Sequence, residues 1–433
     1  MTIEQLHQEF LQSEGVCTDT RKEVKGTLFF ALRGERFDGN RYVPDAIEKG
    51  CRLAVSSDRE MSINERVVYT PSPLGLLQEL AAFHRRYAGP VVMAITGSNG
   101  KTTTRDLVKA ILERKYSVLA TVGNLNNHIG VPLTLLSLKQ EEVAVIEMGA
   151  NHAGEIRDLA AIASPDLGLI TNVGKAHLEG FGSVDGVLEA KGELYEYLAK
   201  NGGKALVDGG DRVLLQKASD TGVETLVVGE GGDIPVSGRI IGQNPFLEIE
   251  LKVKDQTHRV TSGLVGPYNL QNIVLAAAAG YHFDLPGPDI AGAVASYKPE
   301  NNRSQLIEGA RNRVVMDSYN ANPTSMREAI AGLLEYASSP VMLILGDMAE
   351  LGTVSKEEHL KLYEWIGSLS TDRVLLVGPL FSEVIKPAGN TVVFSGVDEL
   401  VSHLESDPPE GYHILVKGSR VMELERLIPF LVK

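Results

Sequence analysis

From residue 91 onward, continuous apolar runs alternate with segments in which apolar residues recur every three or four positions. The first pair predicts a strand at 91–95 and an amphipathic helix at 101–114, and the second a strand at 143–148 and a helix at 153–163. The same alternation continues with strands at 167–172, 204–207 and 224–228 and a helix at 185–200. Strands that are apolar along their whole length are typical of a parallel sheet covered by helices on both faces.

Two segments interrupt this alternation. Residues 246–253 alternate apolar and polar side chains, which predicts an antiparallel appendage within 235–262, and an alanine-rich helix at 269–280 follows it. Pro-Glu-Asn-Asn at 299–302 is typical of a linker. Beyond it a new α/β series begins, whose expected strands are 313–317, 341–345, 373–377, 391–394 and 412–416.

The N-terminal region mixes short strands and helices and ends before Gly89-Pro90. Its expected strands are 27–32 and 53–56, and its expected helices are 44–49 and 76–87. A length of 433 residues favours about three domains. The sequence therefore predicts an α/β chain with domains at 1–84, 85–299 and 300–433.

Composition narrows the class of protein. The apolar fraction of 43% is ordinary for a globular chain, and no apolar run is long enough to span a membrane. The first residues are polar and acidic, unlike a signal peptide, and two cysteines, Cys17 and Cys51, are too few for a disulfide framework. These features favour a reducing cytoplasm.

The net charge of −14 argues against nucleic-acid binding, which needs a basic face. A nucleotide site in this chain must therefore collect its cations locally, and the candidates are Lys101, Arg303 and Lys417.

The segment after the strand at 91–95 reads Thr-Gly-Ser-Asn-Gly-Lys-Thr-Thr-Thr from residue 96. Glycines let backbone N–H groups close around an anion, and the following helix N-terminus adds donors and a favourable dipole. Lys101 would reach the β- and γ-phosphates of a nucleotide, and the Thr102 hydroxyl would bind Mg²⁺. The loop is a shorter variant of the general pattern, with Gly97 and Gly100 but with Ile95 where the first glycine is expected.

Polar residues at the ends of other predicted strands are candidates for the same site, because open parallel sheets bind ligands there. Glu147 is a candidate Mg²⁺ ligand, and His177 lies in a glycine-rich loop after the strand at 167–172. Asp317 ends a strand of the third domain, and the loop at 346–352 contains two carboxylates that suit an amine or a cation.

Two further residues have ordinary explanations when the sequence pattern is considered alone. Lys191 is typical of a surface lysine on a helix, and Asn269 is typical of a helix N-cap.

Several segments, in order along all three predicted domains, resemble those of the Mur ligases, the ATP-dependent amide-bond ligases of bacterial cell-wall precursor synthesis. Family-like segments are the loop at 96–104, Ile-Glu-Met-Gly-Ala-Asn from 146 and Thr-Asn-Val-Gly-Lys-Ala-His-Leu-Glu from 171. Other segments resemble in particular the ligases that add D-alanyl-D-alanine to UDP-N-acetylmuramoyl-tripeptide. These segments are 18–21, 26–32, 123–130, 317–323 and 345–352.

The resemblance implies roles for individual residues. Lys101, His177 and Lys191 are the implied catalytic residues, and Lys191 matches a lysine that is carbamylated in the family, where the carbamate serves the metal as a carboxylate would. Thr102 and Glu147 would hold a first Mg²⁺, and His177 would help to bind a second. The implied ATP-binding residues are Gly97, Ser98, Asn99, Gly100, Lys101, Thr102, Thr103, Asn269, Arg303 and Asp317.

The resemblance also implies two substrate regions. The uridine nucleotide would bind at Thr18, Asp19, Thr20 and Arg21. D-Ala-D-Ala would bind near Tyr319, Asn320, Asn322, Asp347 and Glu350.

The implied architecture is a small UDP-binding α/β domain, a central P-loop ATPase domain with a mainly parallel sheet, and a C-terminal Rossmann-like domain that closes on ATP. In the implied reaction the tripeptide carboxylate attacks the γ-phosphate of ATP, and the amine of D-Ala-D-Ala then attacks the acyl phosphate. The expected partners are small molecules, with no nucleic acid and no membrane span, and the expected state is a cytoplasmic monomer.

Three alternatives remain open: the preceding Mur ligase, a folylpolyglutamate synthase, and a nucleotide-binding protein that has lost the chemistry. The third residue of the tripeptide, lysine or diaminopimelate, and the base that takes the amine proton cannot be read from the sequence.

Overall fold

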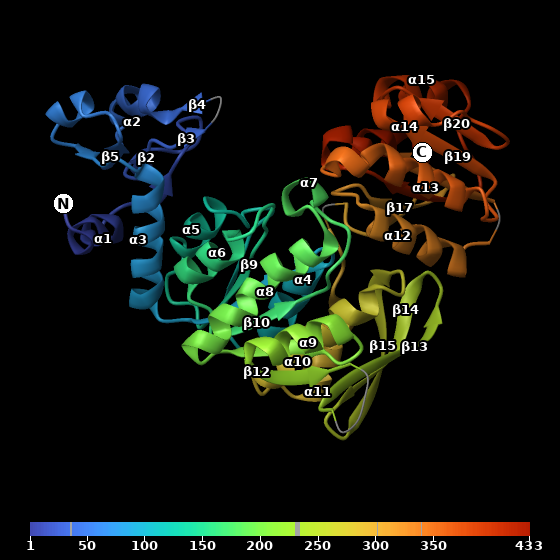
Figure 1. Cartoon of the computed structure of the whole chain (residues 1–433), viewed down its shortest axis with the longest axis horizontal. Coiled ribbons are helices and arrows are strands. Elements are labelled where there is room, and N and C mark those ends of the chain that lie inside the picture. Colours follow the sequence, from blue (N-terminus) through green and yellow to red (C-terminus); the bar gives the residue numbers. More distant parts are fainter. Residues whose placement is uncertain (35–36, 230–233, 301, 339) are drawn as a thin grey trace.

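The computed structural model describes residues 1–34, 37–229, 234–300, 302–338 and 340–433. It contains an N-terminal, a central and a C-terminal α/β unit, and the outer two stand on either side above the central one (Figure 1). This arrangement confirms the predicted α/β fold with three domains. Residue 301 of the predicted linker at 299–302 lies outside the described residues.

The N-terminal unit is built on a small parallel sheet in the order β1-β2-β5-β6. Its strands are β1 (Val16–Cys17), β2 (Leu28–Phe30), β5 (Leu53–Ser56) and β6 (Val67–Tyr69), with a separate pair β3 (Arg33–Gly34) and β4 (Phe37–Asp38). Its helices are α1 (Ile3–Leu11), α2 (Val43–Glu48) and α3 (Pro73–Ala88). Helix α3 begins before the predicted residue 76, because the Ser72 hydroxyl accepts the Gly75 N–H and Pro73 occupies the first turn.

The central unit contains a parallel sheet of six strands in the order β12-β11-β10-β7-β9-β8. The strands are β7 (Val91–Thr96), β8 (Val118–Ala120), β9 (Val143–Glu147), β10 (Leu167–Ile170), β11 (Lys204–Asp208) and β12 (Glu224–Val228). Strand β7 lies between β9 and β10, and the chain passes from one side of β7 to the other. Such a switch point opens a crevice at the carboxyl end of the sheet. The predicted strands are confirmed, and β8 is an edge strand that the sequence pattern missed.

The helices of the central unit cover both faces of this sheet, which explains why its inner strands β7, β9 and β10 are almost entirely apolar (Figure 1). They are α4 (Lys101–Leu112), α5 (Gly130–Leu135), α6 (Glu155–Ala163), α7 (Leu178–Phe181), α8 (Val184–Asn201), α9 (Arg212–Thr221), α10 (Asn269–His282) and α11 (Gly287–Ser296). The predicted antiparallel appendage is confirmed as a separate sheet of β13 (Val236–Gln243), β14 (Phe246–Val253) and β15 (Gln256–Val265). Helix α10 packs against both this sheet and α4.

The C-terminal unit contains a mixed sheet in the order β16-β17-β21-β18-β19-β20. Its strands are β16 (Gln305–Glu308), β17 (Arg313–Asp317), β18 (Val341–Gly346), β19 (Arg373–Val377), β20 (Thr391–Phe394) and β21 (His413–Lys417). Only β16 pairs in the antiparallel sense among the described strands of this sheet. The α-helices are α12 (Pro323–Tyr336), α13 (Ser355–Ile366), α14 (Pro379–Val384), α15 (Val397–Ser406) and α16 (Ile428–Val432). The five predicted strands are confirmed.

Helices within the described ranges are all too short or too polar to cross a membrane. Cys17 and Cys51 are both buried and unpaired, so they pack as small core residues.

A buried histidine pair lies where the N-terminal unit meets the central one. His7 Nε2 of α1 lies 3.0 Å from His84 Nδ1 of α3, and His84 Nε2 lies 2.9 Å from the Leu138 carbonyl oxygen. The carbonyl can only accept, so His84 donates from Nε2 and accepts the His7 N–H at Nδ1. Burial lowers the pKa of both imidazoles, and the proximity of His84 lowers the pKa of His7 further. Both imidazoles of this pair are therefore neutral in the folded protein.

We expect this pair to make the stability of the protein sensitive to acid. The unfolded histidines bind protons near the ordinary pKa of 6.5, whereas the folded ones resist protonation, so stability is full above that pH and declines as the pH falls below it. His7→Phe keeps the ring contacts with Phe83 and Tyr87 and removes one titrating group. The melting temperature of this variant should decline less steeply than that of the wild type between about pH 7 and about pH 5. Equal slopes in scanning fluorimetry would contradict the assignment.

Candidate active site

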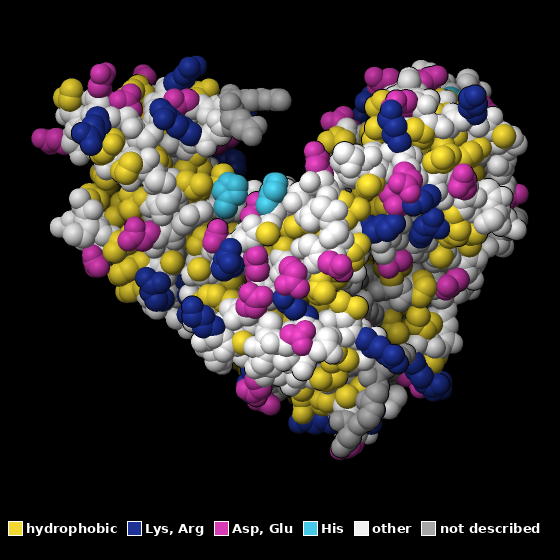
Figure 2. Space-filling view, in the orientation of Figure 1, with side chains coloured by type: hydrophobic (Ala, Val, Ile, Leu, Met, Phe, Trp, Pro, Cys, Tyr) yellow, Lys and Arg dark blue, Asp and Glu magenta, His cyan; other side chains and the backbone are white. Residues whose placement is uncertain are grey.

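A cavity of about 960 Å³ lies at the carboxyl ends of β7, β9 and β10 and extends between the central and C-terminal units. Figure 2 shows the molecule hollowed between its two outer units, above the central one. Most of the predicted site residues line this cavity. They are Ser98, Asn99, Gly100, Lys101, Thr102, Thr103, Glu147, His177, Asn269, Arg303, Asp317, Tyr319, Asn320, Asn322 and Glu350.

The phosphate loop follows β7 and leads directly into α4, as predicted. Gly97 and Gly100 have φ values of 143° and 77°, which L side chains rarely adopt. A Cβ atom at Gly97 would overlap the Thr171 hydroxyl, and one at Gly100 would overlap the Asn272 amide oxygen. Both glycines are therefore required by conformation and by space.

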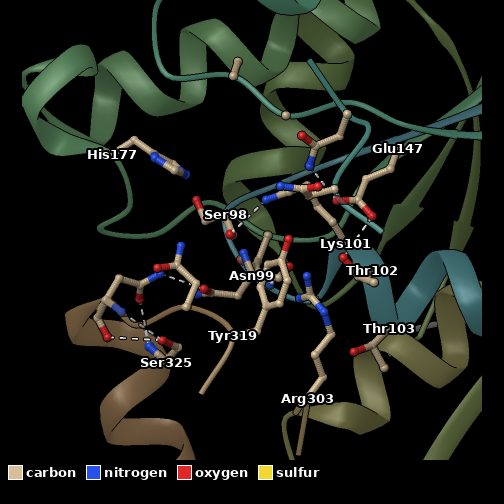
Figure 3. A pocket seen from close by; sticks show the side chains of 18 of the residues that line it. Ser98, Asn99, Lys101, Thr102, Thr103, Glu147, His177, Arg303, Tyr319 and Ser325 are labelled. Atoms are coloured by element: carbon tan, nitrogen blue, oxygen red, sulfur yellow. Dashed lines mark hydrogen bonds between the residues drawn. The ribbon is translucent and has the colours of Figure 1, made fainter. Parts of the chain in front are cut away.

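Lys101 occupies the first position of α4 and turns back over the loop (Figure 3). Its Nζ donates to the carbonyl oxygens of Gly97 at 2.6 Å and Ser98 at 3.1 Å. Desolvation lowers the pKa of the Lys101 ammonium, and the charge of Glu147 opposes this shift. A cation enclosed at the start of a helix is placed to neutralise a bound phosphate.

Thr102 and Glu147 bring two hard oxygen donors together. Glu147 ends β9 and is 2% exposed, and its Oε2 accepts the Thr102 hydroxyl at 2.9 Å (Figure 3). Its Oε1 accepts the Asn126 amide at 2.8 Å. A hydroxyl and a carboxylate are a donor set that suits Mg²⁺. In the described residues no three His, Cys, Asp or Glu side chains gather into a metal site, so an ion here would need phosphate oxygens and water as further ligands.

The interpretation of Lys191 as a surface residue is wrong. Its side chain is 1% exposed on α8, and its Nζ lies 3.5 Å from the Ala150 carbonyl and 5.4 Å from the centre of the Phe181 ring. Burial lowers the pKa of the Lys191 amine well below its ordinary value, and the positive charge of Lys101 lowers it further. A neutral amine is the form that reacts with carbon dioxide, so the environment fits the carbamylation that the family resemblance implies.

His177 and Glu350 lie against each other where the central and C-terminal units meet. His177 Nδ1 is 2.7 Å from Glu350 Oε2, although the angle does not match a regular hydrogen bond. This contact lowers the pKa of the Glu350 carboxyl. Lys175 Nζ and Glu358 Oε1, 2.7 Å apart, join the same two units. The contacts bring the predicted His177 and the acidic loop at 346–352 to one wall of the cavity.

The C-terminal unit contributes a second group of charges to the cavity. Lys417 Nζ donates to Asp317 Oδ2 at 2.6 Å, so the carboxylate at the end of β17 is already paired. The Arg303 guanidinium lies over the Tyr319 ring, 3.6 Å from its centre (Figure 3). Asn322 caps α12 and donates from Nδ2 to Asn99 Oδ1 at 2.7 Å, which links this unit directly to the phosphate loop.

Some predicted residues take other positions. The Asp347 side chain does not line the cavity, because its carboxylate accepts the Leu380 and Phe381 N–H groups at the start of α14. The segment 18–21 also lies outside the cavity, in the N-terminal unit. There Asp19 pairs with Arg21, which holds the pKa of the Asp19 carboxyl at about 2. The N-cap interpretation of Asn269 is wrong, since Tyr268 occupies the cap and Asn269 Nδ2 donates to the Val265 carbonyl.

Three polar residues near the phosphate loop were missed from the sequence, of which Arg105 and Asn272 are buried and Asn126 is partly buried. Arg105 and Asn126 both bind Glu147, and Asn272 accepts the Thr104 hydroxyl beside Gly100. Arg105 could have been found from the sequence, because it follows Thr102 by three residues and residues three apart lie on the same face of a helix.

Comparisons with known proteins agree with this geometry. The chain matches the family models "Mur ligase family, catalytic domain" over residues 12–85, "Mur ligase middle domain" over 95–280 and "Mur ligase, glutamate ligase domain" over 302–420. It therefore belongs to the Mur ligase family.

Similar curated proteins include two enzymes named UDP-N-acetylmuramoyl-tripeptide–D-alanyl-D-alanine ligase. The one from Bacillus subtilis is 35% identical, covering 97% of this chain and 93% of the relative, and the one from Escherichia coli is 36% identical, covering 96% and 93%. Similar solved structures include MurF from Acinetobacter baumannii, with a TM-score of 0.89 at 31% identity over 100% of this chain and 98% of that one. MurF from Thermotoga maritima in complex with ADP has a TM-score of 0.86 at 28% identity over 97% of each chain.

The burial of Lys191 generates a testable prediction. Lys191→Ala should reduce turnover by roughly 100-fold, as loss of a group that supports a metal site commonly does, and short carboxylic acids should restore part of it. Lys200→Ala, which removes an exposed lysine from the last turn of the same helix, is the matched control and should leave turnover unchanged. Steady-state ADP release measures both, and near-normal activity of Lys191→Ala would refute a role for this amine.

Proposed function

We propose that this chain joins D-Ala-D-Ala to the tripeptide carboxylate of UDP-N-acetylmuramoyl-tripeptide, with cleavage of ATP to ADP and phosphate. The observation on which this proposal rests is the single cavity in which the phosphate loop and Glu147 of the central unit face Arg303, Asp317 and Lys417 of the C-terminal unit. The names of the similar full-length relatives support the choice of substrates.

The chemistry of the reaction explains why such a cavity is needed. A carboxylate is a poor acyl donor, so it first attacks the γ-phosphorus of ATP, forming an acyl phosphate and releasing ADP. The dipeptide amine then attacks the acyl carbon, an amide bond forms, and phosphate leaves. Both steps shift negative charge over phosphoryl oxygens, and Lys101 with the backbone N–H groups at the N-terminus of α4 would stabilise that charge.

We further propose that Mg²⁺ assists, with Thr102 and Glu147 at one ion and His177 and carbamylated Lys191 at a second. When bound, such ions neutralise the developing charge on the phosphoryl group. The environments of Glu147 and Lys191 support these two assignments. The remaining loop residues Ser98, Asn99 and Thr103, together with Asn269, Arg303 and Asp317, would enclose the nucleotide.

The domain limits 1–84, 85–299 and 300–433 are proposed as functional units. The first would bind the uridine nucleotide through residues 18–21, and the third would bind D-Ala-D-Ala beside Tyr319, Asn320, Asn322 and Glu350. Asp347 would act there by fixing α14 and the loop at 346–352, since its carboxylate is occupied by α14.

We propose that the active state is a monomer. The use of ATP and the free thiols Cys17 and Cys51 support a cytoplasmic location.

The proposed reaction predicts a strict requirement for both substrates. ADP release should need UDP-N-acetylmuramoyl-tripeptide and D-Ala-D-Ala together, and mass spectrometry should find the pentapeptide product. Lys101→Ala should lower the rate by about 100-fold or more, because it removes a cation from the transferring phosphoryl group. Tripeptides ending in lysine and in diaminopimelate should be tested side by side.

Three results would redirect the proposal. Robust turnover with a single amino acid in place of D-Ala-D-Ala would point to the preceding Mur ligase, and turnover with a folate substrate would point to a folylpolyglutamate synthase. Tight ATP binding without ADP formation in the complete mixture would indicate a nucleotide-binding protein without catalysis.

A further inference from the structure

Arg105 is a buried arginine that the proposed chemistry does not use. It lies on α4 one turn after Thr102, and its side chain is 6% exposed. Its Nη1 donates to Glu147 Oε2 at 3.0 Å, and the same oxygen accepts the Thr102 hydroxyl. The guanidinium therefore contacts the very carboxylate that the proposed function assigns to Mg²⁺.

The other edges of the guanidinium are also occupied. Nε and Nη2 both donate to Asp106 Oδ1, at 2.8 and 2.7 Å, and Nη1 also donates to the Gly123 carbonyl at 3.0 Å. Gly123 begins the loop whose Asn126 binds the second oxygen of Glu147. Arg105 thus holds Glu147, α4 and this loop in one arrangement, and a planar five-donor group is suited to that task.

The charged side chains around Thr102 and Glu147 balance one another. Three carboxylates, Glu147, Asp106 and Glu350, and three cations, Arg105, Lys101 and Arg303, act on one another here and balance. A free divalent ion approaching Thr102 and Glu147 therefore meets no excess negative charge and must compete with hydrogen bonds that Glu147 already accepts. The phosphates of a nucleotide would add the missing negative charge and further oxygen ligands.

We infer that Arg105 is a positioning residue that makes divalent-cation binding at Thr102 and Glu147 depend on bound nucleotide. The arginine orients the carboxylate toward the Thr102 hydroxyl and offsets its charge, so that the ion enters together with the phosphates. This inference rests on the proposed function, because it takes Thr102 and Glu147 as the cation ligands.

Binding of Mn²⁺, followed by the electron paramagnetic resonance signal of the free ion, tests this inference without turnover. The wild type should bind Mn²⁺ at least about tenfold more tightly with ADP than without it, because the diphosphate supplies charge and ligands. Arg105→Gln should bind Mn²⁺ without nucleotide about tenfold more tightly than the wild type, since one buried positive charge next to Glu147 is lost.

Three variants complete the experiment. Arg105→Lys keeps the charge and should match the wild type without nucleotide. Lys109→Gln removes an exposed charge from the same helix and should also match it. The double variant Arg105→Gln/Glu147→Gln removes both members of the buried pair, and it should lose the nucleotide-independent binding that Arg105→Gln gains.

The outcomes separate this inference from the proposed function. Wild-type protein that binds neither ADP nor Mn²⁺·ADP would overturn the proposed function. Wild-type protein that binds Mn²⁺ equally with and without ADP would overturn the role of Arg105 even if Arg105→Gln does not fold. Unchanged or weaker Mn²⁺ binding by a folded Arg105→Gln would overturn it as well.

Discussion

The cavity depends on compensation of buried charge. The chain has a net charge of −14, yet the site must accept a polyanion, and it does so with cations that are each balanced by a neighbour. Lys417 pairs with Asp317, Arg105 pairs with Glu147 and Asp106, and the Arg303 guanidinium rests on the Tyr319 ring. Lys101 donates to the carbonyl oxygens of Gly97 and Ser98. Lys191 is the exception, because among the described residues its buried amine reaches one acceptor, the Ala150 carbonyl at 3.5 Å, and its pKa is strongly lowered. Unbalanced buried charges are costly, so this exception marks a group suited to chemical modification.

The central and C-terminal units contact each other directly at this cavity. Asn322 reaches the phosphate loop through Asn99, and His177 contacts Glu350 at one wall of the cavity. An acyl phosphate would be hydrolysed if water entered, so the proposed reaction benefits from walls contributed by both units. Figure 3 shows the two sets of side chains facing one space, with the phosphate loop between them. The proposed reaction therefore depends on the position of the C-terminal unit.

The long apolar runs of the sequence predicted the fold. The polar residues at the ends of the predicted strands predicted part of the site. Strands β8 and β16 were missed because Val118–Ala120 is very short and Gln305–Glu308 is only partly buried. Lys191 was misjudged, although it lies four residues from both Val187 and Tyr195, which are fully buried on α8. That spacing places Lys191 on the buried face. Asp347 was expected near D-Ala-D-Ala, and only the tertiary position of α14 reveals the N–H groups that its carboxylate binds instead.

Transfer of oxygen from the carboxylate to phosphate tests the central claim most directly. The terminal carboxylate of UDP-N-acetylmuramoyl-tripeptide would be labelled with ¹⁸O, and the inorganic phosphate released in the presence of ATP and D-Ala-D-Ala would be analysed by mass spectrometry. Attack of the carboxylate on the γ-phosphorus predicts that each phosphate released contains one ¹⁸O atom from the substrate. Phosphate without the label, formed together with the amide product, would contradict an acyl phosphate at this site.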